Sequence, residues 1–562
     1  MNGSVVETET ELQGLLDQRL KNISRVLLSE LPLVVAVAGG IFLRLYQITL
    51  QVVSDDEWHA LHALMTGSFS SIATHFGLAD YCIPLALAFK ASYLVCGLSE
   101  SIMRFPVLFC GIGFLLVAPW MVRVWMGREI SIAFAWLIAV SPLLIYYSRY
   151  SRPYIISVFL CFAAIFAFFE WWKGVSEHGR VVYLICAILG PYFHLSTLSF
   201  VVAPLGYALI ESLVFKQHGS RVKRELAQVS ALVFVGLGLL LAPPLIFDKS
   251  GWSEKLANQQ VRLDSMWGSA ELLAGTAAGW LVLAVLLLAV AGSVTLFHRQ
   301  RRFGAYLMFL IASQIGANVM IGPAGLQVPI VFVRYSLPCL PLILILAAVA
   351  VSGLEEHVRK WVMVPGGTLA VLLGITLFLL GPLPQIYRYP NNWTNHGLFQ
   401  YCYDPAARAF HYRFITRPRN IPEFYRDLGK HPNGSRKILE APWFYEWHNN
   451  PFPHFQQVHR QQMLIGFVDH SEKFRRAGEY PANLERMRFR NFVHLSQHDE
   501  LVARGVDYVV LHKDLASEVL NGPNIIPVDM GGWISEYRSI YGEPCFEDST
   551  IVAFQINPDA SR

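Results

Sequence analysis

Three consecutive acidic residues near the start of the chain, Asp55, Asp56 and Glu57 in the stretch SDDEWHALH at residues 54–62, could act as proton acceptors. The stretch directly follows an apolar run long enough to cross a membrane, where a carboxylate beside lipid is costly. One interpretation is structural, because Ser54 and Glu57 have the spacing of a capping box that begins a surface helix. A capping box needs neither Asp55 nor Asp56, so the acids equally indicate a chemical site.

The same stretch carries two histidines. Asp55, His59 and His62 stand at i, i+4 and i+7, so they share one face of the helix that the capping box predicts. Such a face could bind a divalent metal, although a wet interfacial face is the commoner use of this pattern. The sequence leaves both interpretations open.

Arginines could supply the complementary charge. The stretch YYSRYSRPY contains Arg149 and Arg152, and RYSLPCLPL begins with Arg334. Guanidinium groups suit phosphate, so this set could recognise an anionic ligand such as a lipid phosphate. Taken singly, each arginine could instead be a contact to lipid headgroups. Arg44 and Arg104 are expected on the same side of the membrane.

A lone histidine, His194, stands between aromatic residues in GPYFHLSTLSF. Such a histidine is usually a hydrogen-bonded packing residue, so His194 is a candidate for lining a site and no more.

The composition indicates the class of protein that must position these residues. Of 562 residues, 54% are hydrophobic and 15% are charged, whereas soluble domains have about 25% charged residues. The chain is therefore expected to be a polytopic membrane protein. Its net charge of +4 gives no reason to expect a nucleic-acid partner.

Eleven apolar runs have lengths close to the ~20 residues that a spanning helix needs. They are residues 31–50, 105–122, 130–147, 154–172, 181–194, 196–215, 228–247, 271–297, 303–322, 335–353 and 361–382. A further run, 83–97, is shorter and is expected to be an in-plane or re-entrant helix.

Basic residues predict which loops face the cytoplasm. Clusters follow every second span, for instance Arg123 and Arg128 after the second and Arg299 after the eighth. Residues 1–30 are expected to form a cytoplasmic amphipathic helix. The predicted outer segments are 51–104, 148–153, 248–270, 323–334 and everything from about 383 onward.

The tail, residues 383–562, alternates helical and strand patterns. IPEFYRDLGK precedes SRKILEAPWFYEW, and HDELVARG precedes VDYVVLHKD. This alternation predicts a small α/β domain with a partly parallel sheet. Cys402 and Cys545 are the cysteines of this polar tail, and they could form a disulfide if the tail is extracytoplasmic.

Five stretches in collinear order, within about residues 31–355, resemble the polytopic glycosyltransferases of the GT-C class. They are RLYQITLQVVSDDEWHA, IPLALAFKASYLVCGLSESIMRFPVLFCGIG, SPLLIYYSRYSRPY, PYFHLSTL and VRYSLPCLPL. The resemblance points to the bacterial branch of protein O-mannosyltransferases, lipid A aminoarabinose transferase and RgtA/B/C/D-like lipopolysaccharide glycosyltransferases. It implies that residues 31–382 form a catalytic membrane domain and that the tail is periplasmic.

The resemblance implies that a monosaccharide moves from a polyprenyl phosphate to a hydroxyl acceptor at the outer face of a bacterial inner membrane. The acceptor could be lipid A or lipopolysaccharide, a cell-envelope glycan or a protein. The family's Asp-Glu pair falls on Asp56 and Glu57, which makes Asp56 the expected general base, with Asp55 as its competitor. The family's Gln-Glu-Ala-Arg in the second outer loop is replaced by Arg149, Tyr150, Ser151 and Arg152. The acid of that motif is lost, which weakens any metal site built from both loops.

Residue chemistry fits such a transfer. A base must take the hydroxyl proton, and positive charge must stabilise the departing phosphate. Asp56 could supply the first, and Arg152 and Arg334, with Arg149, the second. The residues expected to line the site are His59, His62, Tyr154, His194, Tyr335 and Arg44. No cofactor is expected to be required, and a divalent metal stays an open alternative.

Two other functions compete with this interpretation. A transporter or flippase of a lipid-linked sugar would place ionisable residues near the middle of its spans. An O-antigen polymerase or ligase would carry its large outer loop between late spans. Here the ionisable residues gather at the outer ends, Arg44 and Lys90 included, and the informative loop follows the first span.

Overall fold

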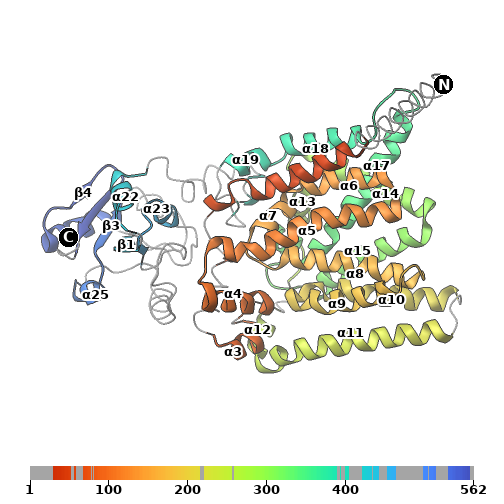
Figure 1. Ribbon diagram of the computed structural model, residues 1–562, viewed down its shortest axis with the longest axis horizontal. Helices are drawn as coiled ribbons and strands as arrows, with labels where there is room; N and C mark the ends of the chain where they lie inside the picture. Colours follow the sequence, from red (N-terminus) through yellow and green to blue (C-terminus); the bar gives the residue numbers. More distant parts are fainter. Residues whose placement is uncertain are drawn as a thin grey trace, which may run out of the picture.

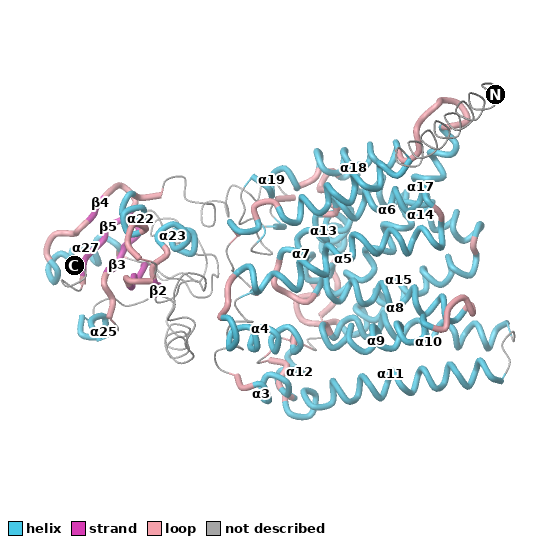
Figure 2. Tube along the Cα trace, in the orientation of Figure 1, coloured by secondary structure: helices cyan, strands magenta, loops and turns pink. Residues whose placement is uncertain are grey.

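The computed structural model consists of a long bundle of α-helices and a small domain built on one β-sheet (Figures 1 and 2). The structure describes residues 29–51, 56–57, 67–77, 79, 81–215, 220–255, 259–388, 393, 399–400, 402–403, 421–432, 434–441, 452–463, 498–503, 505–513 and 529–556. Asp55, His59, His62 and residues 1–28 of the predicted amphipathic helix lie outside these residues, while Ser29 and Glu30 belong to the first span. The chain is therefore a polytopic helical membrane protein with a C-terminal α/β domain, as the sequence predicts.

The first half of the bundle begins with the span Ser29–Leu50, whose last residues form the 3₁₀ turn Ile48–Leu50. The helices that follow are α3 (Phe69–Thr74), α4 (Ile83–Cys96), α5 (Glu100–Met126), α6 (Arg128–Val140), α7 (Pro142–Arg149), α8 (Tyr154–Trp172), α9 (His178–Phe193) and α10 (Leu198–Phe215).

The second half of the bundle runs from residue 220 to residue 388. Its helices are α11 (Ser220–Phe247), α12 (Lys249–Glu254), α13 (Leu263–Ala274), α14 (Gly279–Arg299), α15 (Arg301–Ile321), α16 (Pro329–Ser336), α17 (Leu340–Val358), α18 (Thr368–Leu380) and α19 (Leu383–Arg388). The short helices α3, α4 and α12 lie at the end of the bundle nearest the C-terminal sheet, which we call the loop end (Figure 1).

Eight helices among the described residues are long and apolar enough to cross a membrane, and a ninth span results if α6 and α7, bent by 57°, are counted together. Two more of the predicted spans correspond to α9 and α18, which are shorter than 18 residues. The predicted total of eleven needs both of them to cross, and it stays a prediction. The predicted span 271–297 is divided at Gly275, whose φ of 78° ends α13 before α14 begins.

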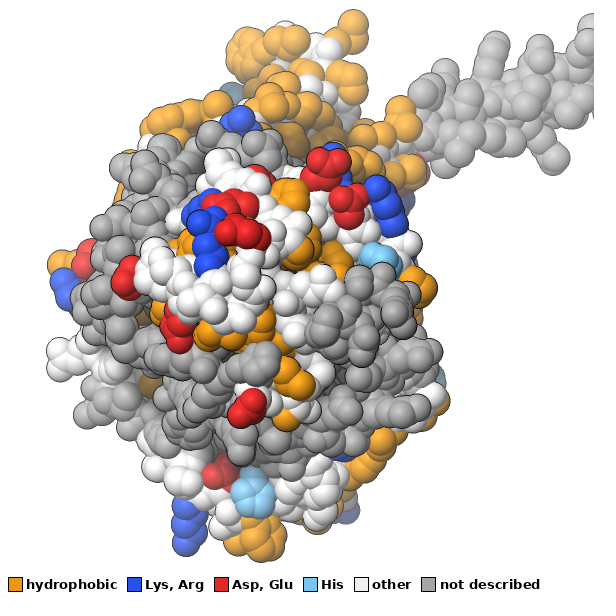
Figure 3. Space-filling view, turned by 90° about the vertical axis from the view of Figure 1, so that its left-hand side faces the viewer, with side chains coloured by type: hydrophobic (Ala, Val, Ile, Leu, Met, Phe, Trp, Pro, Cys, Tyr) orange, Lys and Arg blue, Asp and Glu red, His pale blue; other side chains and the backbone are white. Residues whose placement is uncertain are grey.

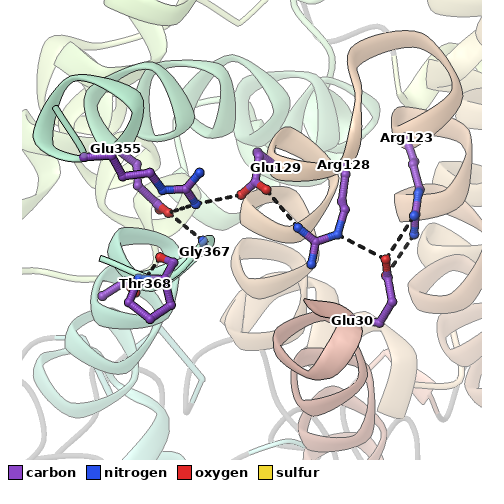
Figure 4. A network of polar contacts seen from close by, with 9 residues as sticks. Glu30, Arg123, Arg128, Glu129, Glu355, Gly367 and Thr368 are labelled. Atoms are coloured by element: carbon purple, nitrogen blue, oxygen red, sulfur yellow. Dashed lines mark hydrogen bonds and ion pairs between the residues drawn. The ribbon is translucent and has the colours of Figure 1, made fainter. Parts of the chain in front are cut away.

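Charged residues join the helices at the opposite end of the bundle, which we call the basic end (Figure 4). Glu30 accepts hydrogen bonds from Arg123 at 2.9 Å and from Arg128 at 3.1 Å. Arg128 also contacts Glu129 at 2.8 Å, and Glu129 contacts Arg359 at 3.2 Å. This network links the first span to α5, α6 and the end of α17. By the positive-inside rule, its arginines predict that the basic end is cytoplasmic.

The C-terminal domain contains a five-stranded sheet in the order β2-β1-β3-β5-β4. Its elements are α22 (Glu423–Leu428), β1 (Lys437–Ala441), α23 (Phe452–His459), β2 (Gln462–Met463), α25 (His498–Ala503), β3 (Tyr508–His512), α27 (Met530–Tyr541), β4 (Phe546–Glu547) and β5 (Ile551–Gln555). β1 pairs in parallel with β2 and β3, while β5 pairs antiparallel with β3 and β4. The prediction of a partly parallel sheet is confirmed.

This domain has ion pairs on its surface and a hydrogen-bonded group of polar side chains in its core. On its surface, Glu547 pairs with Lys513 at 2.7 Å and with Arg538, and Figure 3 shows Lys and Arg side chains beside Asp and Glu side chains on this face. In its core, Glu440 accepts a hydrogen bond from Tyr425 at 2.9 Å and contacts His512 at 2.5 Å. The polar core residues therefore tie α22 to the carboxyl ends of β1 and β3.

Cys402 and Cys545 are not joined in a disulfide. Cys402 is buried in the segment that follows α19, next to Tyr403, whereas the thiol of Cys545 contacts the carbonyl of Ala553 at 3.3 Å. The disulfide that the sequence left open is thus absent: Cys402 is buried, whereas Cys545 is exposed directly before β4.

Replacing Glu355 by Gln should destabilise the bundle by about 2 kcal/mol, because charge-assisted hydrogen bonds of a buried carboxylate are lost. Glu355 accepts from Arg359 at 2.7 Å and from the N–H groups of Gly367 at 2.6 Å and Leu369 at 3.2 Å, where α18 begins. The matched control is Glu356→Gln, at a half-exposed neighbour where we expect a change below about 0.5 kcal/mol. Thermal unfolding in detergent measures both, and equal shifts would contradict the role of Glu355.

Replacing Gly292 by Ala should destabilise the contact of α14 with α17 by about 1–3 kcal/mol. An added Cβ would lie 1.7 Å from the carbonyl oxygen of Leu346, so the two helices would have to separate. Small residues allow such close approach in membrane bundles. Gly353→Ala is the control, because a Cβ there meets nothing within 4 Å. A lower unfolding temperature is expected for the first variant, and an equal effect of both would refute this packing argument.

Candidate functional site

Glu57 is a fully buried carboxylate at the loop end of the bundle. Its Oε2 accepts from Nη2 of Arg104, at the start of α5, at 3.2 Å, and its Oε1 accepts from the backbone N–H of Ser151 at 2.7 Å. Burial raises the pKa of Glu57, and the positive charge of Arg104 only partly opposes this increase. Arg104 also donates to the carbonyl of Gln51, so it joins the end of the first span to Glu57. These contacts make Glu57 a residue that holds the site together.

Asp56 is more accessible than its neighbour, with a side chain that is 26% exposed. Its Oδ2 contacts Nη1 of Arg334 at 3.0 Å, and its backbone carbonyl accepts from Nη1 of Arg152 at 3.4 Å. The predicted base and two of the predicted phosphate-binding arginines therefore lie together. They come from the first loop, the turn between α7 and α8, and α16.

A tight turn presents Ser151 and Arg152 to the two carboxylates. The N–H of Arg152 donates to the carbonyl of Tyr150 at 2.6 Å, which closes a three-residue turn. Pro153, with φ of −71°, then begins α8. The turn directs the Ser151 N–H to Glu57 while the Arg152 side chain reaches Asp56.

An interruption between α16 and α17 places Arg334 at the end of α16. The sequence LPCLP contains Pro338, which supplies no N–H, and the chain forms a 3₁₀ turn at Leu337–Cys339. Two amide side chains of α15 satisfy polar groups there: Gln314 donates to the Tyr335 carbonyl at 2.8 Å, and Asn318 donates to the Ser336 hydroxyl at 3.0 Å. A neutral polar face of α15 thus stabilises the break.

Aromatic rings surround the Arg334 guanidinium. Its Cζ lies 5.5 Å from the ring centre of Tyr154 and 5.6 Å from that of Tyr335. His194 contacts both rings, at 5.0 Å and 6.0 Å between centres, and its Nδ1 lies 2.6 Å from the hydroxyl of Ser196. Three residues predicted to line the site are therefore beside Arg334, where aromatic faces stabilise a cation.

Arg149 occupies a different position from Arg152 despite their closeness in sequence. It is fully buried, and its Nη1 donates to the carbonyls of Arg44 at 3.0 Å and Tyr46 at 2.7 Å. Its Nε donates to the Gln51 side chain at 3.1 Å. These contacts use Nε and Nη1, while Nη2 is buried without a hydrogen-bond partner among the described residues, so the expected role of Arg149 in binding a donor phosphate stays a prediction.

Arg44 likewise serves the bundle. Its guanidinium donates to the carbonyl of Gly40 at 2.9 Å, to the carbonyl of Ile138 at 3.3 Å and to the hydroxyl of Ser148 at 3.3 Å. The first span, α6 and α7 are joined by these bonds. The prediction that Arg44 lines the site is not supported by these contacts, since its partners are groups of the bundle.

Loops that are distant in sequence are also joined at this end. The Asp248 carboxylate accepts from the N–H of Gly77 at 2.7 Å and from the N–H of Gly251 at 3.0 Å, which links the chain after α3 to α12. The hydroxyl of Tyr335 reaches the carbonyl of Ala324 at 3.3 Å. These bonds fix the loops around the site.

Sequence reasoning missed three contributions to the site. Neither the residue type nor the sequence spacing of Ser151 and Gln51 indicates that the Ser151 backbone N–H and the Gln51 side chain contribute to the site. Arg104 was noted only as an arginine expected on the outer side, although its place one turn into an apolar helix indicates a buried partner.

No group of three or more His, Cys, Asp or Glu side chains within the described part of the chain could hold a metal ion. Asp56 and Glu57 each face an arginine, so this pair of donors does not fit a divalent cation. Asp55, His59 and His62 lie outside the described residues, and the expectation for them is unchanged.

Comparison with solved structures gives distant likenesses. ArnT from Cupriavidus metallidurans in the apo state is 12% identical over 94% of this chain and 98% of its own, with a TM-score of 0.48. The same protein bound to undecaprenyl phosphate gives 12% identity over 93% and 98%, with a TM-score of 0.46. The Archaeoglobus fulgidus oligosaccharyltransferase, in complex with Zn and sulfate, is 13% identical over 88% and 70%, with a TM-score of 0.41.

No protein-family model matches the chain, and no curated protein matches it either. With identities of 12–13% and TM-scores below 0.5, the structural likenesses do not assign a function to this chain.

Replacing Glu57 by Gln should change how stability depends on pH. A carboxyl with a raised pKa in the folded protein stabilises the fold fully below its ordinary value of 4.5, and this contribution is lost as the pH rises through the folded pKa. Gln cannot titrate, so the unfolding temperature of the wild type minus that of the variant should fall as the pH rises above 4.5. Thermal unfolding from about pH 4 to about pH 8 measures this difference. A difference that does not change with pH would show that the pKa of Glu57 is not raised.

Proposed function

We propose that this protein is an inverting glycosyltransferase that moves a monosaccharide from a polyprenyl-phosphate donor to a hydroxyl acceptor at the extracytoplasmic face of a membrane. The observation that carries the proposal is the contact of Asp56 with Arg334 at 3.0 Å, with Arg152 donating to the backbone of the same aspartate. A proton acceptor and two phosphate-binding groups therefore share one place at the end of a membrane bundle.

The reaction needs these two kinds of group at once. As the anomeric carbon becomes electrophilic, the attacking hydroxyl must lose its proton, and the 26% exposed carboxylate of Asp56 can take it. The bond from the sugar to the phosphate oxygen breaks, and the lipid phosphate leaves with an additional negative charge. Arg334 and Arg152 can stabilise that charge. A single displacement inverts the anomeric centre, in contrast to a mechanism with a covalent glycosyl-enzyme intermediate.

Arg334 has the donors for this role. One of its N–H groups binds Asp56, while its buried Nε has no hydrogen-bond partner among the residues that the structure describes. A buried donor without a partner is costly, and a phosphate oxygen would satisfy it. The aromatic rings of Tyr154 and Tyr335 hold the guanidinium in place. We assign phosphate binding to Arg334 and Arg152, and we do not include Arg149, because it is fully buried among main-chain carbonyls and aromatic rings.

The location at the end of the bundle fits a substrate that is half lipid. A polyprenyl chain needs an apolar environment, while its phosphate and sugar need polar groups at the membrane surface. Arg123, Arg128 and Arg359 lie at the basic end, and by the positive-inside rule this supports the proposal that the loop end is outside the cytoplasm. The acceptor would approach from the aqueous side, where the C-terminal domain also lies.

A transporter of lipid-linked sugars is the alternative that one observation favours. Its spans would be interrupted within the membrane, and the breaks at Leu195–Thr197 and Leu337–Cys339 have this form. The polar residues that support the second break, Gln314 and Asn318, are neutral amides. The carboxylates of the site gather instead at the loop end, which favours a reaction at the surface over passage through the bundle.

Replacing Asp56 by Asn should lower sugar transfer by about 100-fold to 10,000-fold, because the general base is lost while the side chain keeps its size. The measurement is mass analysis of surface glycolipids and glycoproteins from cells that lack the gene and carry each variant. Asp264→Asn is the matched control, since Asp264 is 70% exposed on α13 and is expected to keep full transfer. Undiminished transfer by Asp56→Asn in a folded protein would refute Asp56 as the base.

Replacing Arg334 by Ala should weaken the binding of undecaprenyl phosphate by at least about tenfold, because a charge-assisted hydrogen bond contributes about 1.5–3 kcal/mol. Arg334→Lys should recover part of the affinity, since a lysine keeps the charge but not the planar fork. Binding to the purified protein in lipid nanodiscs is the measurement. Equal affinity of the wild type and Arg334→Ala would exclude Arg334 from the phosphate site.

A further inference from the structure

We propose that Trp393, in the segment that joins the bundle to the C-terminal domain, is a positioning residue for the site. It acts through Arg149 and Gln51 on the turn that carries Ser151 and Arg152. The effect of Trp393 on transfer rests on the proposed function, while its effect on the turn does not.

Trp393 packs against the guanidinium of Arg149. The ring of Trp393 is fully buried, and the Cζ of Arg149 lies 5.2 Å from its centre. Tyr387 lies on the same guanidinium at 5.9 Å, and its ring contacts that of Trp393 edge to face at 5.1 Å. The indole N–H of Trp393 has no hydrogen-bond partner among the described residues. The indole therefore acts through the face of its ring.

The burial of Arg149 explains why this ring matters. Within the described part of the chain, Arg149 forms no ion pair with a carboxylate, so its charge is balanced by main-chain carbonyls, by Gln51 and by the two rings. A buried guanidinium is tolerated only when its surroundings are arranged to stabilise it. Removing one ring face would leave both a cavity and a poorly compensated charge directly before the turn.

Gln51 connects the same segment to the site. Its side-chain Nε2 donates to the carbonyl of Arg149 at 3.0 Å and to the carbonyl of Trp393 at 3.4 Å. Its Oε1 accepts from Nε of Arg149 at 3.1 Å, and its backbone carbonyl accepts from Arg104. Gln51 thus contacts Arg149, Trp393 and Arg104. Of these, Arg104 and the turn that follows Arg149 contact Asp56 and Glu57.

Two short routes lead from this cluster to the carboxylates. On one route, Arg149 is followed by Ser151, whose N–H binds Glu57 at 2.7 Å, and by Arg152, which contacts the backbone of Asp56. On the other route, Arg104 binds Glu57 at 3.2 Å. A displacement of Arg149 would therefore reach the predicted base within a few bonds. Trp393, which precedes the C-terminal domain in the chain, would thereby support the site.

Hydrogen exchange with mass spectrometry on the full-length protein in nanodiscs tests the proposal directly. In Trp393→Ala, the peptide that contains Ser151 should exchange at least tenfold faster, because the N–H that binds Glu57 is released. Trp393→Phe keeps a ring face and should exchange like the wild type. Trp361→Ala is the matched control, because Trp361 is 79% exposed at the basic end and should change nothing at this peptide.

Unchanged exchange at this peptide in Trp393→Ala would overturn the proposal, as would a uniform increase over all peptides of the bundle, which indicates general destabilisation. If Trp393→Ala does not fold, Gln51→Met provides the test, since it removes the hydrogen bonds while keeping the side-chain length. The same local increase is expected there, and its absence would also overturn the proposal.

The binding of undecaprenyl phosphate separates this inference from the proposed function. If both hold, Trp393→Ala and Arg152→Ala each weaken binding about tenfold while Trp361→Ala does not. Faster exchange at Ser151 together with unchanged binding by Arg152→Ala and Arg334→Ala would support the positioning role and refute the phosphate site. Weakened binding by the arginine variants with unchanged exchange in Trp393→Ala would refute the positioning role alone.

Discussion

Two neighbouring carboxylates at the end of a membrane bundle impose a constraint that much of the structure satisfies. Burying a charge is costly, so the buried Glu57 needs a cation within hydrogen-bond distance, and the more exposed Asp56 also has one. Arg104 serves Glu57 and Arg334 serves Asp56, over sequence separations of 47 and 278 residues. The first loop, α5 and α16 are therefore held together by charge. The two acids differ in exposure: Glu57 is a buried structural carboxylate, and Asp56 is accessible.

Helices that stop at the loop end make this arrangement possible. Arg334 reaches Asp56 because α16 ends in a 3₁₀ turn, and Ser151 faces Glu57 because α7 ends in a tight turn. Backbone groups released at such breaks need partners inside a membrane. Gln314 provides a partner for the carbonyl of Tyr335 without adding charge. The interruptions thus belong to the site and do not require a transport pathway through the bundle.

Two described aromatic residues of the segment after α19, Trp393 and Phe399, pack against the membrane bundle. Trp393 and Tyr387 contact the guanidinium of Arg149, and Tyr146 stacks on Phe399 at 4.3 Å between ring centres. The C-terminal domain has its own polar core, in which Tyr425, Glu440 and His512 are hydrogen bonded. These bonds join α22 to β1 and β3 inside the C-terminal sheet region.

The sequence by itself determined the class of protein, the position of most spans, the gathering of basic residues at one end and the partly parallel sheet of the tail. The predicted span 154–172 coincides with α8, for example, because apolar length and periodicity are properties of neighbouring residues. Charge next to an apolar run also drew attention to Arg149, Arg152 and Arg334, while Asp56 was chosen as the expected base from the resemblance to the GT-C class; these roles stay predictions.

Only the tertiary structure determined which partner each charged or polar side chain contacts. Arg149 and Arg152 stand three residues apart and read alike in sequence, yet one is buried among carbonyls and rings while the other reaches Asp56. Gln51 and Trp393 gave no signal, because their contacts join segments 342 residues apart. Local pattern indicates where most spans lie, but the partner of a polar side chain depends on how distant helices pack. That packing is set by the whole bundle.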